Sequence, residues 1–395
     1  MLKIWLKKTF FVLLEIALIG GALWFVAQKK GIRNISQIEP AIEQLAGKAT
    51  QQAQPFPELK QSETKTFSWT YKGFKYSLPL TLYGSVDAFY GAQPKTYSYA
   101  GTLSANWQDQ YYSMFLKPND QDKTISDLAA QLQALGKKHG LGDDQIVELT
   151  MAFVQAIPYD DARAKQILAG DSNTTMQYPY ETLFRQLGVC SDKSLLSYAL
   201  LKQMGYGVAL LAYEQDNHMA LGIQCPQNYS TYGSGYCYAE TTSVGNKIGI
   251  IPSLDSQSNK TVDLAALDPT KNQQINLQQL GQVTIYDAYQ GREYDGIIAT
   301  QKIESEIAEL SQSIQALIPK IAAQKTAIAS QQQDLQDLKS KMDNLKNSQN
   351  VSSYNALVPK YNSMVENYQK AVKNFNNAVN LYNSQVARYN LLITQ

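Results

Sequence analysis

The chain of 395 residues contains only two histidines and three cysteines. A zinc centre needs several such side chains at short, regular spacings, and the spacings here match no zinc pattern. We therefore expect no metal site, and the sequence gives no reason to expect a cofactor. The scarcity also gives weight to each of these residues, because a site that uses His or Cys has few to draw on.

Net charge is also small. The chain has 35 basic and 34 acidic residues, a formal charge of +1, and its Lys and Arg residues do not gather into a basic patch. Nucleic-acid-binding proteins usually carry such a patch, because it neutralises the phosphate backbone. The sequence therefore predicts that nucleic acid is not a partner.

Charged residues are nearly absent from one N-terminal segment. Residues 9–27 form an apolar run that only Glu15 interrupts, with basic residues on both sides. About 20 apolar residues in a helix span the hydrocarbon core of a bilayer. The run has no small-x-small cleavage site, so we predict an uncleaved membrane anchor over residues 1–30 and a stalk and linker over residues 31–66. The flanking charges nearly balance and do not fix the orientation of this anchor.

From Phe67 the pattern becomes that of a folded α+β domain over residues 67–292. Alternating apolar residues around Lys72-Gly73 predict a β-hairpin. Amphipathic patterns predict helices over two ranges and a further helix from Cys190 to a left-handed cap at Gly205. The two helical ranges are 126–139 and 143–156, and the predicted strands cover 206–213, 218–224, 235–242, 248–251 and 282–286.

Residues 297–395 have a different pattern again. Apolar side chains recur at alternating spacings of four and three, with a polar break at residues 347–350. After the break, one seam position is aromatic at Tyr354, Tyr361, Tyr368, Phe375, Tyr382 and Tyr389. A period of 3.5 residues predicts two long helices in an antiparallel hairpin or coiled coil. Its simplest role is that of a spacer or of a surface for self-association or for an envelope partner.

Three residues stand in the contexts that a thiol amidase needs. Cys190 opens a predicted helix, His218 begins a predicted strand, and Glu240 lies on the next strand. A helix N-terminus and a nearby imidazolium both stabilise a thiolate, and a carboxylate can orient the imidazole. Each residue alone has an ordinary structural explanation, such as a buried core thiol. Together and in this order, they favour a catalytic triad.

The same part of the chain resembles the transglutaminase-like superfamily, a papain-like group of thiol enzymes, and in particular its archaeal and bacterial secreted members. The matching stretches are Phe153–Tyr159, Tyr178–Leu183, Gly188–Ser194, Leu200–Tyr206, Asn217–Gly222 and Tyr238–Thr242. The resemblance implies that Cys190 is the nucleophile, that His218 acts as general base and then acid, and that Glu240 orients the imidazole. Many relatives have Asp in this last position.

Alternatives remain for the acid and for the oxyanion hole. Asp268, in an Asp-Pro-Thr sequence, is a rival to Glu240, although it lies 50 residues beyond His218. The backbone N–H of Cys190 is one expected oxyanion donor, and the side chain of Gln155 is a possible second. Gln155 could equally bind local backbone groups.

Cys225 and Cys237 bracket a loop rich in Tyr, Gly and Ser. If the domain lies outside the cytosol, we expect these two residues to form a disulfide and to leave Cys190 as the single free thiol. Direct pairing of the two cysteines in a regular ladder would move Glu240 away from His218. A bulge, or a disulfide outside the ladder, would have to absorb that difference.

Together these features predict a membrane-anchored, extracytoplasmic enzyme that attacks amide bonds of a protein or peptide substrate through a thioester intermediate. We expect hydrolysis rather than cross-linking, because no feature marks an amine-binding site. The alternative is a non-catalytic envelope scaffold or peptide-binding protein. Such a protein would use the thiol domain for binding and the coiled coil for assembly.

Overall fold

The computed structural model describes residues 55–99, 102–171, 174–255, 260–261, 277–278 and 280–393. The predicted anchor (1–30), most of the predicted stalk and Asp268 lie outside these ranges. Within the described ranges, no helix is both long enough and apolar enough to cross a bilayer.

The domain begins with a two-stranded antiparallel sheet, β1 (Ser62–Tyr71) and β2 (Phe74–Tyr83). The predicted turn at Lys72-Gly73 is confirmed: both residues have positive φ, at 47° and 79°, as a two-residue hairpin turn requires. The sheet starts five residues before the predicted boundary at Phe67. Trp69 packs edge-on against Phe153, with ring centroids 5.3 Å apart, and so fixes the hairpin to a neighbouring helix.

Seven helices occur between this hairpin and the main sheet in the described ranges. They are α3 (Gly84–Gly91), α4 (Trp107–Leu116), α5 (Thr124–Lys138), α6 (Asp143–Gln155), α7 (Asp161–Leu168), α8 (Pro179–Arg185) and α9 (Cys190–Gln203). The predicted helices at 126–139 and 143–156 correspond to α5 and α6. The helix predicted at Cys190 is α9, and Gly205 has the expected left-handed conformation with φ of 87°. Helix α9 packs against α4, α5, α6 and α8 and against two strands of the main sheet, so the helix is held from several sides.

The main sheet is antiparallel and has the strand order β5-β4-β3-β9. Its strands are β3 (Val208–Tyr213), β4 (His218–Gln224), β5 (Tyr236–Ala239) and β9 (Thr284–Tyr289). A small second sheet contains β6 (Leu254–Asp255), β7 (Lys260–Thr261) and β8 (Leu277–Gln278). Short 3-10 turns, η2 (Glu214–Asp216), η3 (Gln227–Tyr229) and η4 (Thr231–Gly233), occupy the connections on either side of β4.

The predicted strand at 248–251 does not form. Gly249 has φ of 88°, outside the range of a strand, and its N–H donates to the carbonyl oxygen of Tyr238 at 2.7 Å. Ile248 is buried all the same. The apolar alternation at this point therefore reports a buried turn rather than a strand.

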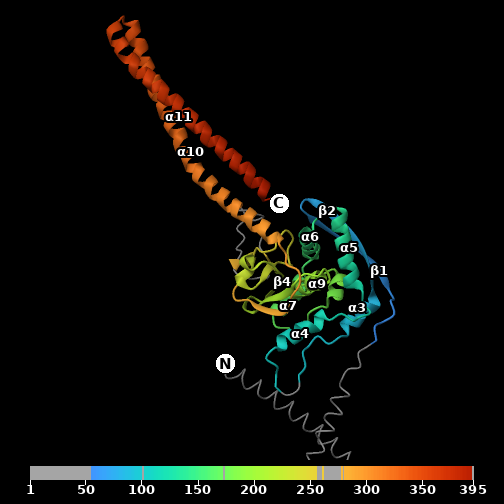
Figure 1. Ribbon diagram of the computed structural model, residues 1–395. Helices are drawn as coiled ribbons and strands as arrows, with labels where there is room; N and C mark the ends of the chain where they lie inside the picture. Colours follow the sequence, from blue (N-terminus) through green and yellow to red (C-terminus); the bar gives the residue numbers. More distant parts are fainter. Residues whose placement is uncertain are drawn as a thin grey trace, which may run out of the picture. The chain divides into compact units, whose positions relative to one another are not determined.

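The C-terminal part is a pair of long helices, α10 (Gly296–Asn347) and α11 (Val351–Leu392), which lie side by side in Figure 1. The predicted break at 347–350 separates them. Their antiparallel pairing is fixed near the open end, where Arg388 donates to both carboxylate oxygens of Glu306 at 2.6 and 2.9 Å. The helical hairpin is thus present, and its supercoiling stays a prediction.

Candidate active site

Cys190 is the first residue of α9. Gly188, just before it, forms a parallel bridge with Tyr159. A Cβ at Gly188 would lie 3.1 Å from Thr182 Cγ2 and 3.2 Å from Asp192 Cβ, so a larger residue would require these side chains to move by a few tenths of an ångström. The N–H groups in the first turn of a helix have no acceptor within the helix. The backbone N–H of Cys190 is therefore placed to serve as an oxyanion donor.

Asp192 fixes the start of α9. Its Oδ2 accepts the N–H of Val189 at 2.9 Å, and its Oδ1 accepts the N–H of Gln177 at 2.7 Å. Asp192 is fully buried and also pairs with the Arg163 guanidinium at 2.7 Å. The carboxylate near the helix N-terminus stabilises that end, and the ion pair joins α9 to α7.

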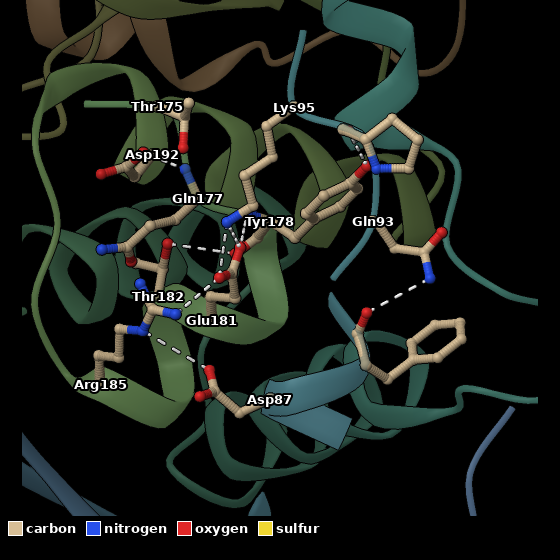
Figure 2. Close-up of polar contacts among 12 residues, drawn as sticks. Asp87, Gln93, Lys95, Thr175, Gln177, Tyr178, Glu181, Thr182, Arg185 and Asp192 are labelled. Atoms are coloured by element: carbon tan, nitrogen blue, oxygen red, sulfur yellow. Dashed lines mark hydrogen bonds and ion pairs between the residues drawn. The ribbon is translucent and has the colours of Figure 1, made fainter. Parts of the chain in front are cut away.

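The segment that leads into α9 has its own buried carboxylate, shown in Figure 2. Glu181, which is fully buried, accepts hydrogen bonds from Lys95 and Arg185, both at 2.7 Å, and from the N–H of Tyr178 at 2.9 Å. These contacts hold α8 and the chain before it. The loop that carries Gly188 and Cys190 is therefore anchored on both sides.

His218 and Glu240 are in contact, as the sequence predicted. His218 is the first residue of β4, and Glu240 directly follows β5. The imidazole Nε2 lies 3.1 Å from Glu240 Oε2, and both side chains are buried. This pairing orients the ring, because an Nε2–H that donates to the carboxylate leaves Nδ1 for another partner.

The Glu240 carboxylate is surrounded by donors. Its Oε1 accepts the N–H groups of Thr241 and Thr242 and the hydroxyl of Thr242, each at 2.8 Å. Its Oε2 accepts the hydroxyl of Tyr238 at 2.5 Å, in addition to facing His218. Hydrogen bonds of this kind stabilise the ionised form of a buried carboxylate.

Burial and pairing act in opposite directions on the pKa values of this pair. Burial lowers the pKa of His218, but the Glu240 carboxylate and the contact with Cys190 outweigh burial and raise it above its ordinary value. Burial raises the pKa of Glu240, but His218, Tyr238 and the Thr242 N–H outweigh burial and lower it. Both directions favour an imidazolium–carboxylate ion pair at neutral pH.

Cys190 and His218 line the same cavity, which has a volume of about 360 Å³. Within the described part of the chain, His218 Nδ1 is buried and has no hydrogen-bond partner of conventional geometry. Cys190 is one of the groups that raise the pKa of His218, so the thiol lies close to the imidazole. The Cys190 Sγ also lies 4.0 Å from the carbonyl oxygen of Asn217.

The cavity has an apolar wall and a polar wall. Helices α4 and α7 supply Tyr111, Tyr112, Ile167 and Leu168, and the β3–β4 connection supplies polar residues such as Glu214. Ile167 and Leu168 are large apolar side chains with 38% and 42% of their surface exposed. An exposed apolar wall beside the Cys190 thiol is suited to binding an apolar side chain of a ligand.

The sequence suggested the Gln155 side chain as a second oxyanion donor, but its amide group has other partners. Its amide Nε2 donates to the carbonyl oxygens of Glu240 and Asn246, both at 2.9 Å. Because both amide hydrogens are used, the contacts of Gln155 do not support a role in the oxyanion hole. Its amide binds backbone carbonyl groups, as in the alternative, but these groups are 85 and 91 residues away in the sequence and not local. Gln155 thereby supports the turn that carries Glu240.

The expected disulfide joins Cys225 and Cys237, with Cα atoms 5.8 Å apart, and Cys190 is the free cysteine. The disulfide is diagonal: Ile223 stands opposite Cys237, and Cys225 lies just beyond the end of β4. Continuing this register puts Glu240 across from Ala220, two residues along β4 from His218. Because Cys225 and Cys237 are not directly opposite each other in the ladder, the disulfide and the contact between His218 and Glu240 are compatible.

The small residues beside His218 do not open a path to substrate. Ala220 is fully buried in a cluster with Leu211, Tyr213, Tyr238 and Leu280, so this face of β4 belongs to the core. Access comes instead from the side of α4 and α7. Sequence patterns did not reveal these walls, and no motif singled out Tyr238 as a partner of Glu240.

A helix-borne cysteine that shares a cleft with a carboxylate-paired histidine, in an α+β domain, is the arrangement that papain-like thiol enzymes have. Residues 123–229 match the family model described as a transglutaminase-like domain, and this stretch of the chain is such a domain. The match includes Cys190 and His218 and ends before Glu240. No match was found among curated proteins or among solved structures.

Proposed function

We propose that this chain is a thiol enzyme that cleaves amide bonds through a triad of Cys190, His218 and Glu240. One observation carries the proposal. The Nε2 of His218 is paired with a buried carboxylate at 3.1 Å, while its Nδ1 has no hydrogen-bond partner within the described residues, and Cys190 lines the same cavity as His218. This is the arrangement that a thiolate–imidazolium pair needs.

The reaction begins with attack of the Cys190 thiolate on the carbonyl carbon of the amide. The resulting oxyanion accepts the backbone N–H of Cys190, and His218 gives its proton to the leaving nitrogen as the C–N bond breaks. The products of this half-reaction are a free amine and a thioester on Cys190. His218, now neutral, removes a proton from water, which attacks the thioester and releases a carboxylic acid. The C–S bond breaks, the sulfur leaves as the thiolate, and the thiolate–imidazolium pair is restored.

Hydrolysis of a peptide is favoured over transfer to an amine. The polar wall of the cleft contains Glu214, whose carboxylate accepts the hydroxyl of Tyr286 at 2.5 Å, and this hydrogen bond reduces its capacity to bind an ammonium group. The apolar wall formed by α4 and α7 suits a peptide side chain next to the scissile bond. Water needs no binding site of its own.

We place this activity outside the cytosol, with the apolar segment at residues 9–27 as the anchor. The disulfide between Cys225 and Cys237 supports this location, because disulfides persist in oxidising compartments. In this proposal the helical hairpin serves assembly, through self-association or through an envelope partner.

The test is alkylation of the intact protein with iodoacetamide from pH 4 to pH 9, followed by mass spectrometry. Cys190 is the free cysteine, so labelling reports its thiolate without background from the disulfide. We expect labelling already at pH 5, where an ordinary thiol with a pKa of about 8.5 is almost entirely protonated. Cys190→Ala should abolish labelling, and His218→Gln should abolish only the labelling at low pH.

Labelling of the wild-type protein that rises only near pH 8.5 would overturn the enzymatic proposal. It would leave the non-catalytic alternative, in which the domain only binds a peptide. If Cys190 does label at pH 5, cleavage of a peptide library by the wild-type protein but not by Cys190→Ala would identify the substrate class.

A further inference from the structure

A buried lysine lies one turn after the nucleophile. Lys193, on α9, is fully buried, a rare environment for a lysine unless its charge is balanced. Its Nζ donates to the carbonyl oxygens of Gln155 at 3.1 Å, Ile157 at 2.7 Å and Thr242 at 3.2 Å. Three acceptors match the three N–H groups of an ammonium.

These three carbonyl groups belong to two segments that are far apart in the sequence. Gln155 and Ile157 come from the end of α6 and the turn after it, whereas Thr242 belongs to the turn after β5. Carbonyl oxygens that converge in a buried space repel one another unless a donor lies between them. The ammonium of Lys193 is that donor, and it is attached to the helix that begins at Cys190.

Two of the partners of Lys193 also bind Glu240. Thr242 donates its N–H and its hydroxyl to Glu240 Oε1, both at 2.8 Å. The amide of Gln155 donates to the carbonyl oxygen of Glu240 at 2.9 Å. Lys193 therefore completes a network that runs from the Cys190 helix to both the side chain and the backbone of the acid.

We propose that Lys193 is a positioning residue of the thiol site. It sets the position of the Glu240 turn relative to α9, so that Glu240 holds the imidazole of His218 beside Cys190. Lys193 acts through Thr242 and Gln155 and not on the reacting atoms. This inference rests on the proposed function, because Lys193 can position the site only if Cys190, His218 and Glu240 act as a triad.

The test compares the pH profile of Cys190 alkylation in wild type and Lys193→Met, a neutral side chain of similar length. If Lys193 positions Glu240, its loss weakens the pairing of Glu240 with the His218 imidazolium. Less of Cys190 is then present as the thiolate at low pH. We expect labelling at pH 5 to slow by about tenfold or more, equivalent to one pKa unit, and labelling at pH 9 to stay within about threefold of wild type.

Ser197→Ala is the matched control. Ser197 is buried on the same helix, and its hydroxyl donates to the carbonyl oxygen of Lys193 at 2.9 Å. This variant should lose some stability and keep the wild-type pH profile. If Lys193→Met does not give a folded protein by circular dichroism, Lys193→Gln replaces it, because Gln retains two N–H donors without a charge.

An unchanged profile in the Lys193 variant, or equal slowing at every pH, would overturn the positioning role. The wild-type profile separately tests the proposed function. A wild-type protein that labels at pH 5, together with a Lys193 variant that labels equally well, would reject the inference and leave the triad intact.

Discussion

The hydroxyl of Tyr238 donates to Glu240 Oε2 at 2.5 Å, to the same oxygen that faces His218. Tyr238 lies on β5, two residues before the acid, and it is fully buried. Glu240 directly follows β5, so the end of this strand brings the acid and its donor together. This donor limits the positions that the carboxylate can take beside the imidazole.

Tyr238→Phe removes this hydrogen bond and the 3.3 Å contact of the hydroxyl with His218 Nε2, and it keeps the aromatic ring. Hydrogen bonds to a charged acceptor typically contribute about 1.5–3 kcal/mol. We therefore expect Tyr238→Phe to lower the free energy of unfolding by an amount in that range. The Tyr238 hydroxyl also helps to lower the pKa of Glu240, so its loss should raise that pKa and weaken low-pH labelling of Cys190. Urea denaturation and the alkylation profile measure the two effects.

Tyr236→Phe is the control for this variant. Tyr236 lies on the same strand and the same face, and its hydroxyl contacts Tyr289 and Gln290 instead of Glu240. Its alkylation profile should match wild type. A Tyr238→Phe profile that also matches wild type would show that Thr241, Thr242 and His218 suffice to hold the acid.

Removal of the disulfide should destabilise the β4–β5 pair. Cys225 and Cys237 are separated by 12 residues, and closing a loop of this size stabilises a fold by about 3 kcal/mol in the chain-entropy model. We expect the double variant Cys225→Ala/Cys237→Ala to lose about 2–4 kcal/mol of unfolding free energy in urea. The wild-type protein in excess reductant should match it, and equal stability of all three samples would contradict the expectation.

Local patterns predicted much of this fold because they depend on neighbours in the sequence. The Lys72-Gly73 turn, the start of α9 at Cys190 and the range of β4 all follow from periodicity and turn chemistry. The contact between His218 and Glu240 was predicted from adjacent strands and family resemblance. The turn, the helix start and the strand range are features that a short stretch of chain can specify by itself, whereas the contact between His218 and Glu240 is not.

The remaining features depend on contacts between distant segments. Gln155 faces the Glu240 turn, 85 residues away, and nothing near it in the sequence indicates that its amide is already paired. Asp192 reads as an ordinary residue of an early helical turn, yet it is buried against Arg163. The diagonal disulfide is a property of the register between β4 and β5, which the spacing of the two cysteines alone does not determine.

The paired titration of His218 and Glu240 predicts how stability depends on pH. The pKa of His218 is raised from 6.5 to about 10, because the Glu240 carboxylate and Cys190 outweigh the opposing effect of burial. Its contribution to stability is therefore full below pH 6.5 and is lost as the pH rises toward about 10. The pKa of Glu240 is lowered from 4.5 to about 2, so its contribution is full above pH 4.5 and is lost as the pH falls toward about 2.

The ion pair should therefore stabilise the fold most between about pH 4.5 and 6.5. Urea unfolding from pH 3 to pH 9 of wild type and Glu240→Gln measures this, since Gln keeps the shape of the side chain and removes its charge. The stability difference between the two proteins should be largest in that window and should shrink on both sides. A difference that is constant with pH would mean that Glu240 stabilises the site through its hydrogen bonds alone and that His218 is neutral in the folded protein.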